Sequence, residues 1–135
     1  MDRLTPQHRS ENMRRIRSKD SVAELLVRRM VYSLGYRYRL NVKTLPGKPD
    51  LVFRRLNKII FVHGCFWHSH PGCIDSHIPK TRTCYWAPKL ARNVERDKRC
   101  TRELRQAGWR VLVVWECGTG NSVKLSRRLE RFLIN

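Results

Sequence analysis

Apolar residues recur along the first half of the chain at helical and then at strand spacing. Residues 21–34 (SVAELLVRRMVYSL) carry apolar side chains three and four positions apart, and Gly35 is a favourable stop, so we predict a helix there. The runs 50–55 (DLVFRR) and 58–63 (KIIFVH) predict two strands that form a hairpin around Asn57.

The remaining pattern completes a mixed domain. Residues 36–40 (YRYRL) alternate and predict a strand before the hairpin. Residues 85–107 predict one long basic helix whose first turn is broken by Pro88. The continuous apolar run 109–115 (WRVLVVW) fits a buried central strand, and residues 122–134 predict an amphipathic helix. The order helix, three strands, helix, strand, helix predicts an α/β domain with a mixed central sheet flanked by helices.

The positive charge of the chain is large for its length. The 135 residues suggest one domain, which we place at 19–135, after a polar and basic N-terminal arm at 1–18. Lys and Arg number 29 against 11 Asp and Glu, which gives a formal net charge of +18. This excess destabilises the compact state by self-repulsion, so a polyanionic partner is its simplest rationale. Charge alone leaves a ribosomal-type RNA binder open.

The chain carries no sequence signal for a membrane or for export. Basic residues are spread from Arg3 to Arg131, with no long apolar run, so we expect no membrane partner. The N-terminus has no apolar signal segment, and we therefore expect a cytoplasmic protein, nucleoid-associated if it is bacterial. Five cysteines, an odd number, favour metal ligation or buried thiols over a disulfide framework.

Two cysteines and three histidines crowd into residues 61–73 (FVHGCFWHSHPGC). Together with a cysteine after the last apolar strand they offer the donors of a closed structural zinc site, which would fold a loop that has little apolar core. The candidate ligands are Cys65, His70, Cys73 and Cys117. His68 is a rival for the imidazole position, and buried thiols with an incidental histidine are the plainer alternative. Cys84 and Cys100 are expected to be core residues.

Four residues are candidates for catalysis. Asp50 follows the turn LPGKP at the start of a strand, where it can point into a cleft, although it can also simply cap the turn. His63 and His68 titrate near neutral pH and can take or give a proton. Glu24 either closes a capping box with Ser21 or serves a metal-bound water or a histidine. A carboxylate and histidines near strand ends, in so basic a chain, favour metal-dependent phosphodiester cleavage.

The segments LPGKPDLVF, FVHGCFWHSHPGC, TRTCYWAPKLARNVERD and GWRVLVVWEC resemble the very-short-patch-repair (Vsr) DNA mismatch endonucleases, from about Ser10 to Cys117. The resemblance implies a restriction-endonuclease-like fold and a Mg²⁺-dependent endodeoxyribonuclease. Its expected activity is nicking one strand of duplex DNA next to a T·G mismatch, the product of 5-methylcytosine deamination, which starts very short patch repair. Mismatch-repair partner proteins fit this role, and a monomer suffices because a nickase needs one active site.

The resemblance also implies how metal ions are held. Mg²⁺ would be bound by the carboxylate of Asp50 and the main-chain carbonyl of Val62, with Asn93 holding a metal-bound water. The implied structural zinc ligands are again Cys65, His70, Cys73 and Cys117. The segment Pro71-Gly72 looks one residue longer than in the family, which can alter the loop shape while keeping the ligands.

Three further roles are implied by the same resemblance. His68 would activate the attacking water, Glu24 would support it, and His63 would lie near the scissile phosphate. The chain also departs from expected patterns at two places. Val62 stands where the family often has a hydroxyl residue, which matters if that hydroxyl takes part in catalysis. No acidic-x-lysine pair follows Asp50, so the site would rely on histidine.

Several aromatic residues look like the family's wedge, which enters the base stack beside the mismatch. Phe66, Trp67 and Trp86 would enter from one side and Met13, on the arm, from the other. A T·G wobble pair is held less well than a Watson–Crick pair, so insertion selects for it. Core packing in the zinc loop is the alternative for Phe66 and Trp67. Two adjacent bulky side chains on an extended segment cannot both point inward, however.

Basic residues spaced three or four apart on the predicted helix at 85–107 are expected to meet DNA phosphates, as are two on the arm. They are Lys89, Arg92, Arg96, Arg99, Arg14 and Arg15. A solvated helix face is the plainer interpretation. Two other functions stay open: a restriction-type endonuclease that acts on fully paired DNA, and a zinc-containing DNA-binding module without catalysis.

Overall fold

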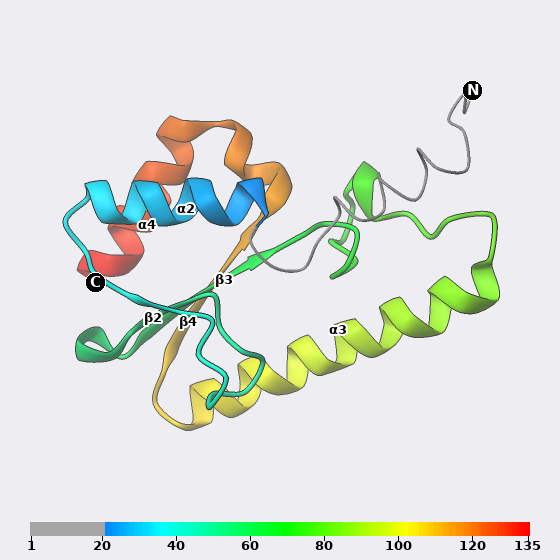
Figure 1. Ribbon diagram of the computed structural model, residues 1–135, viewed down its shortest axis with the longest axis horizontal. Coiled ribbons are helices and arrows are strands. Elements are labelled where there is room, and N and C mark those ends of the chain that lie inside the picture. Colours follow the sequence, from blue (N-terminus) through cyan, green and yellow to red (C-terminus); the bar gives the residue numbers. More distant parts are fainter. Residues whose placement is uncertain (1–20) are drawn as a thin grey trace.

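The computed structural model describes residues 21–135, so the arm predicted at 1–18 lies outside the described residues. The described residues form three α-helices and four strands in the predicted order (Figure 1). Their bounds are α2 Val22–Ser33, β1 Arg39–Leu40, β2 Leu51–Phe53, β3 Lys58–His63, α3 Thr83–Gln106, β4 Arg110–Trp115 and α4 Ser122–Ile134.

The strands form one sheet in the order β1-β2-β3-β4. β1 and β2 are antiparallel, β2 and β3 are antiparallel, and β3 and β4 are parallel, which confirms the predicted mixed sheet. The predicted hairpin is present, and Asn57 adopts the left-handed conformation at its turn with a φ of 55°. Asparagine tolerates this conformation better than most side chains do, which explains why the chain reverses there.

Two strands are shorter than the alternating pattern suggested. The strand predicted at 36–40 pairs only at Arg39–Leu40, and the one predicted at 50–55 ends at Phe53 because residues 54–56 form a 3₁₀ turn. Tyr36 and Tyr38 instead pack their rings edge-on against Phe53, at centroid distances of 6.5 and 6.1 Å. The alternation of aromatic and basic residues in 36–40 therefore reflects the packing of these rings, because only two of the five residues pair as a strand.

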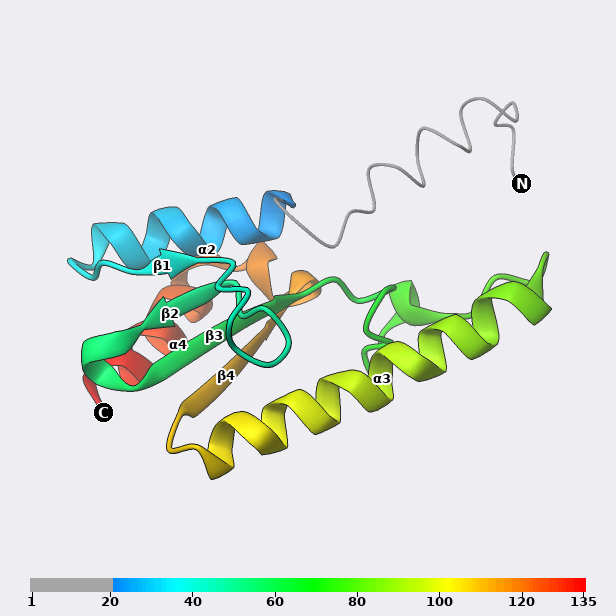
Figure 2. The same ribbon diagram turned by 60° about the horizontal axis from the view of Figure 1, so that its bottom comes forward.

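Helices cover both faces of the sheet. α2 and α4 lie together on one face and α3 lies on the other (Figures 1 and 2). Along β3 the buried side chains alternate between the two layers: Ile60 packs with the α2 and α4 residues, whereas Ile59 and Phe61 pack with Leu104 of α3. All six residues of β3 are buried, so β3 is the central strand of the core.

The prediction that residues 109–115 form a central strand is wrong. β4 pairs only with β3 among the described strands and stands at the edge of the sheet. Its apolar run is continuous because helices cover both of its faces, and sequence does not distinguish an edge strand from a central one when both faces are covered. Arg128 of α4 donates a hydrogen bond of 3.0 Å to the carbonyl of Val113, which occupies an acceptor of this strand.

α2 begins where its sequence predicts, whereas α3 begins earlier than predicted. Ser21 caps α2, because its Oγ accepts a hydrogen bond of 3.2 Å from the main-chain nitrogen of Glu24, as the capping box predicts. α3 begins at Thr83, before the predicted residue 85, and continues through Pro88. The carbonyl four residues before this proline belongs to Cys84, which is exposed, so water can replace the missing hydrogen bond.

None of the described helices has the length and apolar character required to cross a membrane.

Candidate functional site

A cluster of thiols and an imidazole forms where two parallel strands end. The loop after β3 and the residues after β4 supply its members, which are Cys65, His70, Cys73 and Cys117. Their donor atoms all lie within 4.8 Å of one another. Because His63 pairs with Trp115, β3 and β4 both finish at the same end of the sheet, and the residues that follow them come together although they are far apart in sequence.

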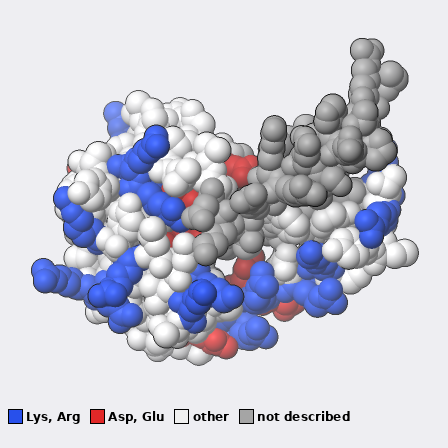
Figure 3. All heavy atoms as spheres, viewed as in Figure 1, with Lys and Arg blue, Asp and Glu red and all other residues white. Residues whose placement is uncertain are grey.

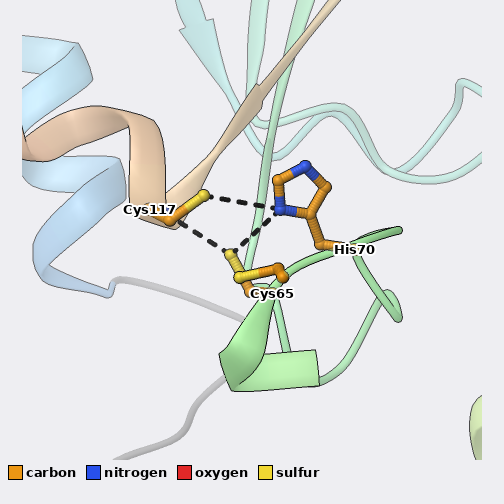
Figure 4. Close-up of side chains that lie close together, drawn as sticks. Cys65, His70 and Cys117 are labelled. Carbon is orange, nitrogen blue, oxygen red and sulfur yellow. Dashed lines mark hydrogen bonds between the residues drawn. The ribbon is translucent and has the colours of Figure 1, made fainter. Parts of the chain in front are cut away.

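The donor atoms of Cys65, His70 and Cys117 face one another (Figure 4). The Nδ1 atom of His70 lies 3.4 Å from the Sγ of Cys117 and 3.7 Å from the Sγ of Cys65. Trp115 stacks on the imidazole of His70 at a centroid distance of 4.1 Å, which fixes the ring plane. Three sulfurs and one nitrogen at this spacing fit a tetrahedral Cys₃His zinc site.

The other thiols and histidines lie elsewhere. His68, the rival ligand, is hydrogen bonded to Asp97 and is not part of the thiol cluster. Cys100 is buried, as expected, but Cys84 is exposed on α3, so the expectation that Cys84 is a core residue is wrong. The exposure follows from the position of Cys84 in the first turn of α3, which extends beyond the sheet (Figure 1).

A second cluster lies beside the first and contains both candidate catalytic histidines. His63, at the end of β3, stacks on His68 with a centroid distance of 3.8 Å and nearly parallel rings. The Nδ1 atom of His68 is 2.5 Å from the Oδ2 of Asp97 on α3. A carboxylate bonded to one ring nitrogen orients the imidazole and leaves the Nε2 atom to accept a proton.

Asp97 was not predicted from the sequence. It lies four residues after Asn93 in RNVERD, one helical turn further along α3. The spacing places both side chains toward the same part of the fold, so this periodicity was an available signal. Without the fold, however, nothing in the sequence pairs Asp97 with a histidine 29 positions away.

His63 is held as a neutral imidazole. Burial, and then the nearby imidazole of His68, lower the pKa of His63 to about 3, against the opposing effect of Asp97. Its Nδ1 atom has no hydrogen-bond partner among the described residues. Its ring also contacts Phe61 and Trp115, at centroid distances of 5.5 and 5.2 Å. A neutral ring packed in this way supports the position of His68.

Asp50, which directly precedes β2, is a buried carboxylate whose side chain reaches the end of β3. Its Oδ2 accepts a hydrogen bond of 2.7 Å from the main-chain nitrogen of Val62, and only 8% of the residue is exposed. Burial raises the pKa of Asp50 to about 7, and the nearby Glu24 adds to this effect, whereas the hydrogen bond from Val62 opposes it. Glu24 is itself buried in α2 and pairs with Arg28 at 3.1 Å.

The residues predicted as a wedge form one aromatic cluster, joined by Tyr85. The ring centroids of Phe66 and Trp67 are 5.3 Å apart, and each lies within 5.8 Å of Trp86. Tyr85, which was not predicted, is 5.0 Å from Trp86. The ammonium of Lys89 lies 5.3–5.7 Å from the rings of Trp67, Trp86 and Tyr85. Cation–π contacts thus place a positive charge beside the rings.

Asn93 joins the aromatic loop to α3, because its Nδ2 donates a hydrogen bond of 3.1 Å to the main-chain carbonyl of Trp67. The adjacent residue in the loop is His68. The aromatic cluster and the His68–Asp97 pair are therefore held to the same helix through contacts four residues apart. The side-chain oxygen of Asn93 remains as an acceptor.

The predicted phosphate-binding residues of α3 line one groove on that helix. Its volume is about 630 Å³, and the described residues lining it include Lys89, Arg92, Asn93, Arg96 and Arg99. A second groove, of about 730 Å³, contains His63, His68 and Asp97 beside Arg102 and Arg105. Figure 3 shows Lys and Arg widely distributed over one face of the molecule, with few acidic side chains among them. The positive potential favours a polyanionic ligand.

Comparison with known proteins identifies the family. The family model described as DNA mismatch endonuclease Vsr matches residues 1–73. The DNA mismatch endonuclease Vsr of Escherichia coli (strain K12) is 41% identical to the chain over 130 residues, which cover 93% of the chain and 83% of that relative. The chain belongs to the Vsr family. It is therefore an endonuclease, a hydrolase that acts on DNA, with a restriction-endonuclease-like fold.

Two proteins named as nicking enzymes are similar to the chain over nearly its whole length. The Type II nicking enzyme V.XorIIP of Xanthomonas oryzae pv. oryzae is 46% identical over 132 residues, 98% of the chain and 96% of that relative. The Type II nicking enzyme V.NmeAIP of Neisseria meningitidis serogroup A is 42% identical over 132 residues, 98% of the chain and 94% of the relative.

The thiol cluster predicts that this Vsr-family chain loses bound zinc when Cys73 is replaced. Cys73→Ser removes one soft donor, and a three-donor site holds zinc more weakly. Zinc content per protein chain, measured by elemental analysis after dialysis, should fall, and the melting temperature should fall with it. Cys84→Ser is the matched control, because Cys84 is exposed and outside the cluster. Undiminished zinc in Cys73→Ser would remove Cys73 from the ligand set.

The raised pKa of Asp50 predicts a pH-dependent cost of folding. Ionisation begins near 3.8 in the unfolded chain and near 7 in the folded protein, so the cost develops between these values and is complete above pH 7. In magnesium-free buffer, Asp50→Asn should increase the free energy of unfolding above pH 7 by up to about 4 kcal/mol. The gain should vanish below about pH 4. Urea unfolding across this range measures it, and a pH-independent gain would contradict the assignment.

Proposed function

We propose that this Vsr-family endonuclease nicks one strand of duplex DNA next to a T·G mismatch and thereby initiates very short patch repair. The observation that carries the proposal is the arrangement of consecutive residues in one loop. Phe66 and Trp67 belong to the aromatic cluster, and the next residue, His68, is oriented by Asp97. A loop built in this way couples insertion into a weakened base stack to chemistry on the adjacent backbone.

His68 is proposed as the general base. The carboxylate of Asp97 holds the Nδ1 side of the ring, so the Nε2 atom is available to take a proton from the attacking water. The resulting imidazolium would be stabilised by the same carboxylate. His63, which is neutral and stacked on His68, would lie near the scissile phosphate without adding a second positive charge to the ring pair.

The donors around Asp50 fit a magnesium ion. A buried carboxylate without a full counter-charge is unfavourable in the folded protein, and a bound divalent cation would offset that cost. The carboxylate of Asp50 and the main-chain carbonyl of Val62 would hold the ion, and Asn93 would hold a metal-bound water through its side-chain oxygen. When bound, Mg²⁺ would supply charge stabilisation to the developing phosphorane and leaving group. Glu24, which is buried close enough to Asp50 to raise its pKa, would add negative charge near the ion.

Zinc is proposed as the structural ion of the loop. Cys65, His70, Cys73 and Cys117 provide four donors, so no coordination position remains open for catalysis. The loop between β3 and α3 carries the aromatic residues and His68 but forms little regular structure, apart from a short 3₁₀ turn at residues 74–76. Anchoring it to the end of β4 would hold these side chains in place.

Mismatch preference is attributed to the wedge of Phe66, Trp67 and Trp86. Opening the stack at a T·G wobble costs less than at a Watson–Crick pair, and stacking on an aromatic ring returns about 1–3 kcal/mol per base. Met13, Arg14 and Arg15, assigned to the arm, lie outside the described residues. Lys89, Arg92, Arg96 and Arg99 would bind phosphates along α3, which makes affinity depend on salt.

Strand-resolved nicking of paired and mismatched duplexes tests this function. The wild-type protein should nick the T·G duplex on one strand in Mg²⁺ and should act weakly on the fully paired duplex. Asp50→Ala should abolish nicking and keep DNA binding, because only the metal anchor is lost. Equal cleavage of both duplexes would favour a restriction-type endonuclease, and nicking by Asp50→Ala would remove Asp50 from the metal site.

A wedge variant separates mismatch preference from general binding. Trp67→Ala should lower the ratio of T·G to paired cleavage more than it lowers total DNA affinity. Tyr32→Ala, at an exposed aromatic on α2, is the matched control. An unchanged ratio in Trp67→Ala would show that the aromatic cluster packs the loop and does not select the substrate.

Substitution of the general base should slow the chemical step. His68→Ala is expected to reduce the single-turnover nicking rate by about 10²–10⁴-fold, with DNA affinity little changed. Asp97→Asn should slow the same step by a smaller factor, since the imidazole remains but loses the carboxylate. Rapid-quench measurements at saturating DNA give both rates. A wild-type nicking rate in His68→Ala would remove His68 from the role of general base. Absence of nicking by the wild-type protein would favour the zinc-containing DNA-binding module without catalysis.

A further inference from the structure

The loop that carries Asp50 is closed by hydrogen bonds between its two sides. The main-chain nitrogen of Asn41 donates to the carbonyl of Asp50 at 3.2 Å, and that of Val42 donates to the carbonyl of Pro49 at 3.3 Å. At its tip, the nitrogen of Lys48 donates to the carbonyl of Leu45 at 3.2 Å. These hydrogen bonds tie together residues 41–50, which we name the Asp50 loop, from its tip to Asp50.

Gly47, at the tip, is packed into the corner between α3 and β3. A Cβ atom added to Gly47 would lie 3.0 Å from the Cβ and 3.3 Å from the Sγ of Cys100, and 3.3 Å from the Cε1 of Phe61. Its φ of +78° also disfavours any side chain. Little space therefore remains between Gly47 and Cys100, and a larger side chain at position 100 would press against the loop tip.

The contacts around this corner close into a ring through the proposed active site. Phe61 touches His63, which stacks on His68, which is hydrogen bonded to Asp97. Asp97 and Cys100 are three residues apart on α3, so they occupy neighbouring positions on the helix. Cys100 then contacts Gly47, which lies beside Phe61 and completes the ring.

Asp50 is held within this ring at a second point. Its Oδ2 accepts the hydrogen bond from the nitrogen of Val62, which lies between Phe61 and His63 on β3. The carboxylate and the imidazole are thus carried by different segments, the Asp50 loop and the loop after β3. α3 contacts both segments, the first through Cys100 and the second through Asp97.

We propose that Cys100 is a positioning residue for DNA cleavage, whose contact with Gly47 sets the separation between the Asp50 carboxylate and the His68 imidazole. The inference rests on the function proposed above, in which Asp50 anchors Mg²⁺ and His68 activates water. In-line attack requires these groups to be placed within a fraction of an ångström, and a displacement of about 1 Å costs roughly 10²-fold in rate. A side chain that neither touches DNA nor reacts thereby controls the chemical step.

Substitutions that change the volume at position 100 test this proposal. Cys100→Leu pushes the loop tip away, so the single-turnover nicking rate at saturating DNA should fall by about 10²-fold. The Mg²⁺ concentration for half-maximal rate should rise, whereas the dissociation constant for T·G duplex and the zinc content should stay near wild type. Cys100→Ser, of similar size, should restore the rate and the Mg²⁺ dependence. Cys84→Leu, at an exposed thiol on the same helix, is the matched control.

Gly47→Ala probes the same contact from the loop and should give the same combination of effects. If Cys100→Leu does not fold, Cys100→Ala replaces it, because an open space beneath Gly47 should also loosen the loop and raise the Mg²⁺ requirement. Unchanged rate and Mg²⁺ dependence in the folded position-100 variant and in Gly47→Ala would overturn the proposal. Losses of DNA affinity as large as the losses of rate would also overturn it.

Asp50→Ala, assayed in parallel, separates failure of this inference from failure of the proposed function. Nicking by Asp50→Ala would reject the metal site itself. An inactive Asp50→Ala together with fully active Cys100→Leu and Gly47→Ala would leave the metal site in place and reject only the positioning role of Cys100.

Discussion

The parallel pairing of β3 with β4 sets His63 opposite Trp115 and so determines where both candidate metal and catalytic groups lie. Two residues beyond each of these positions, Cys65 and Cys117 meet at the thiol cluster. The same register lets Trp115 contact His63, so the thiol cluster and the histidine pair share one wall. A change of one residue in this register would point each side chain to the opposite face of the sheet and separate both groups.

α3 connects the groups at the ends of β3 and β4 to the basic surface. The helix holds the aromatic loop through Asn93, orients His68 through Asp97, and contacts the Asp50 loop through Cys100. It also carries the basic side chains of the groove. Because one rigid element makes all these contacts, the proposed binding of DNA along α3 would be geometrically linked to the alignment of the candidate reactive groups. That link is the reason to propose that the helix belongs to the active site as well as to the DNA-binding surface.

Burial of ionisable groups lowers folding stability at the candidate site. Asp50 and Glu24 are both buried, and the raised pKa of Asp50 shows that its charge is unfavourable there. His63 is kept neutral by burial, which lowers its pKa to about 3. The apolar layers on both faces of β3 compensate for these costs, since all six of its residues are buried. A cation bound to Asp50 would recover part of the lost stability. A carboxylate with a purely structural role would not gain stability from an added cation in this way.

The sequence alone predicted the helices, the hairpin around Asn57 and the thiols and histidines from which a zinc site could be built, because periodicity, turn chemistry and ligand type are local properties. Its long, chemically unusual segments also identified the Vsr family, which the comparisons confirm. The fold then decided that His70, and not its rival His68, lies with Cys65, Cys73 and Cys117. Only the tertiary structure showed that 109–115 is an edge strand, that Asp97 orients His68, and that Gly47 packs against Cys100. These features depend on which strands pair and on how closely a helix approaches a loop, and such long-range packing has no periodic trace in the chain.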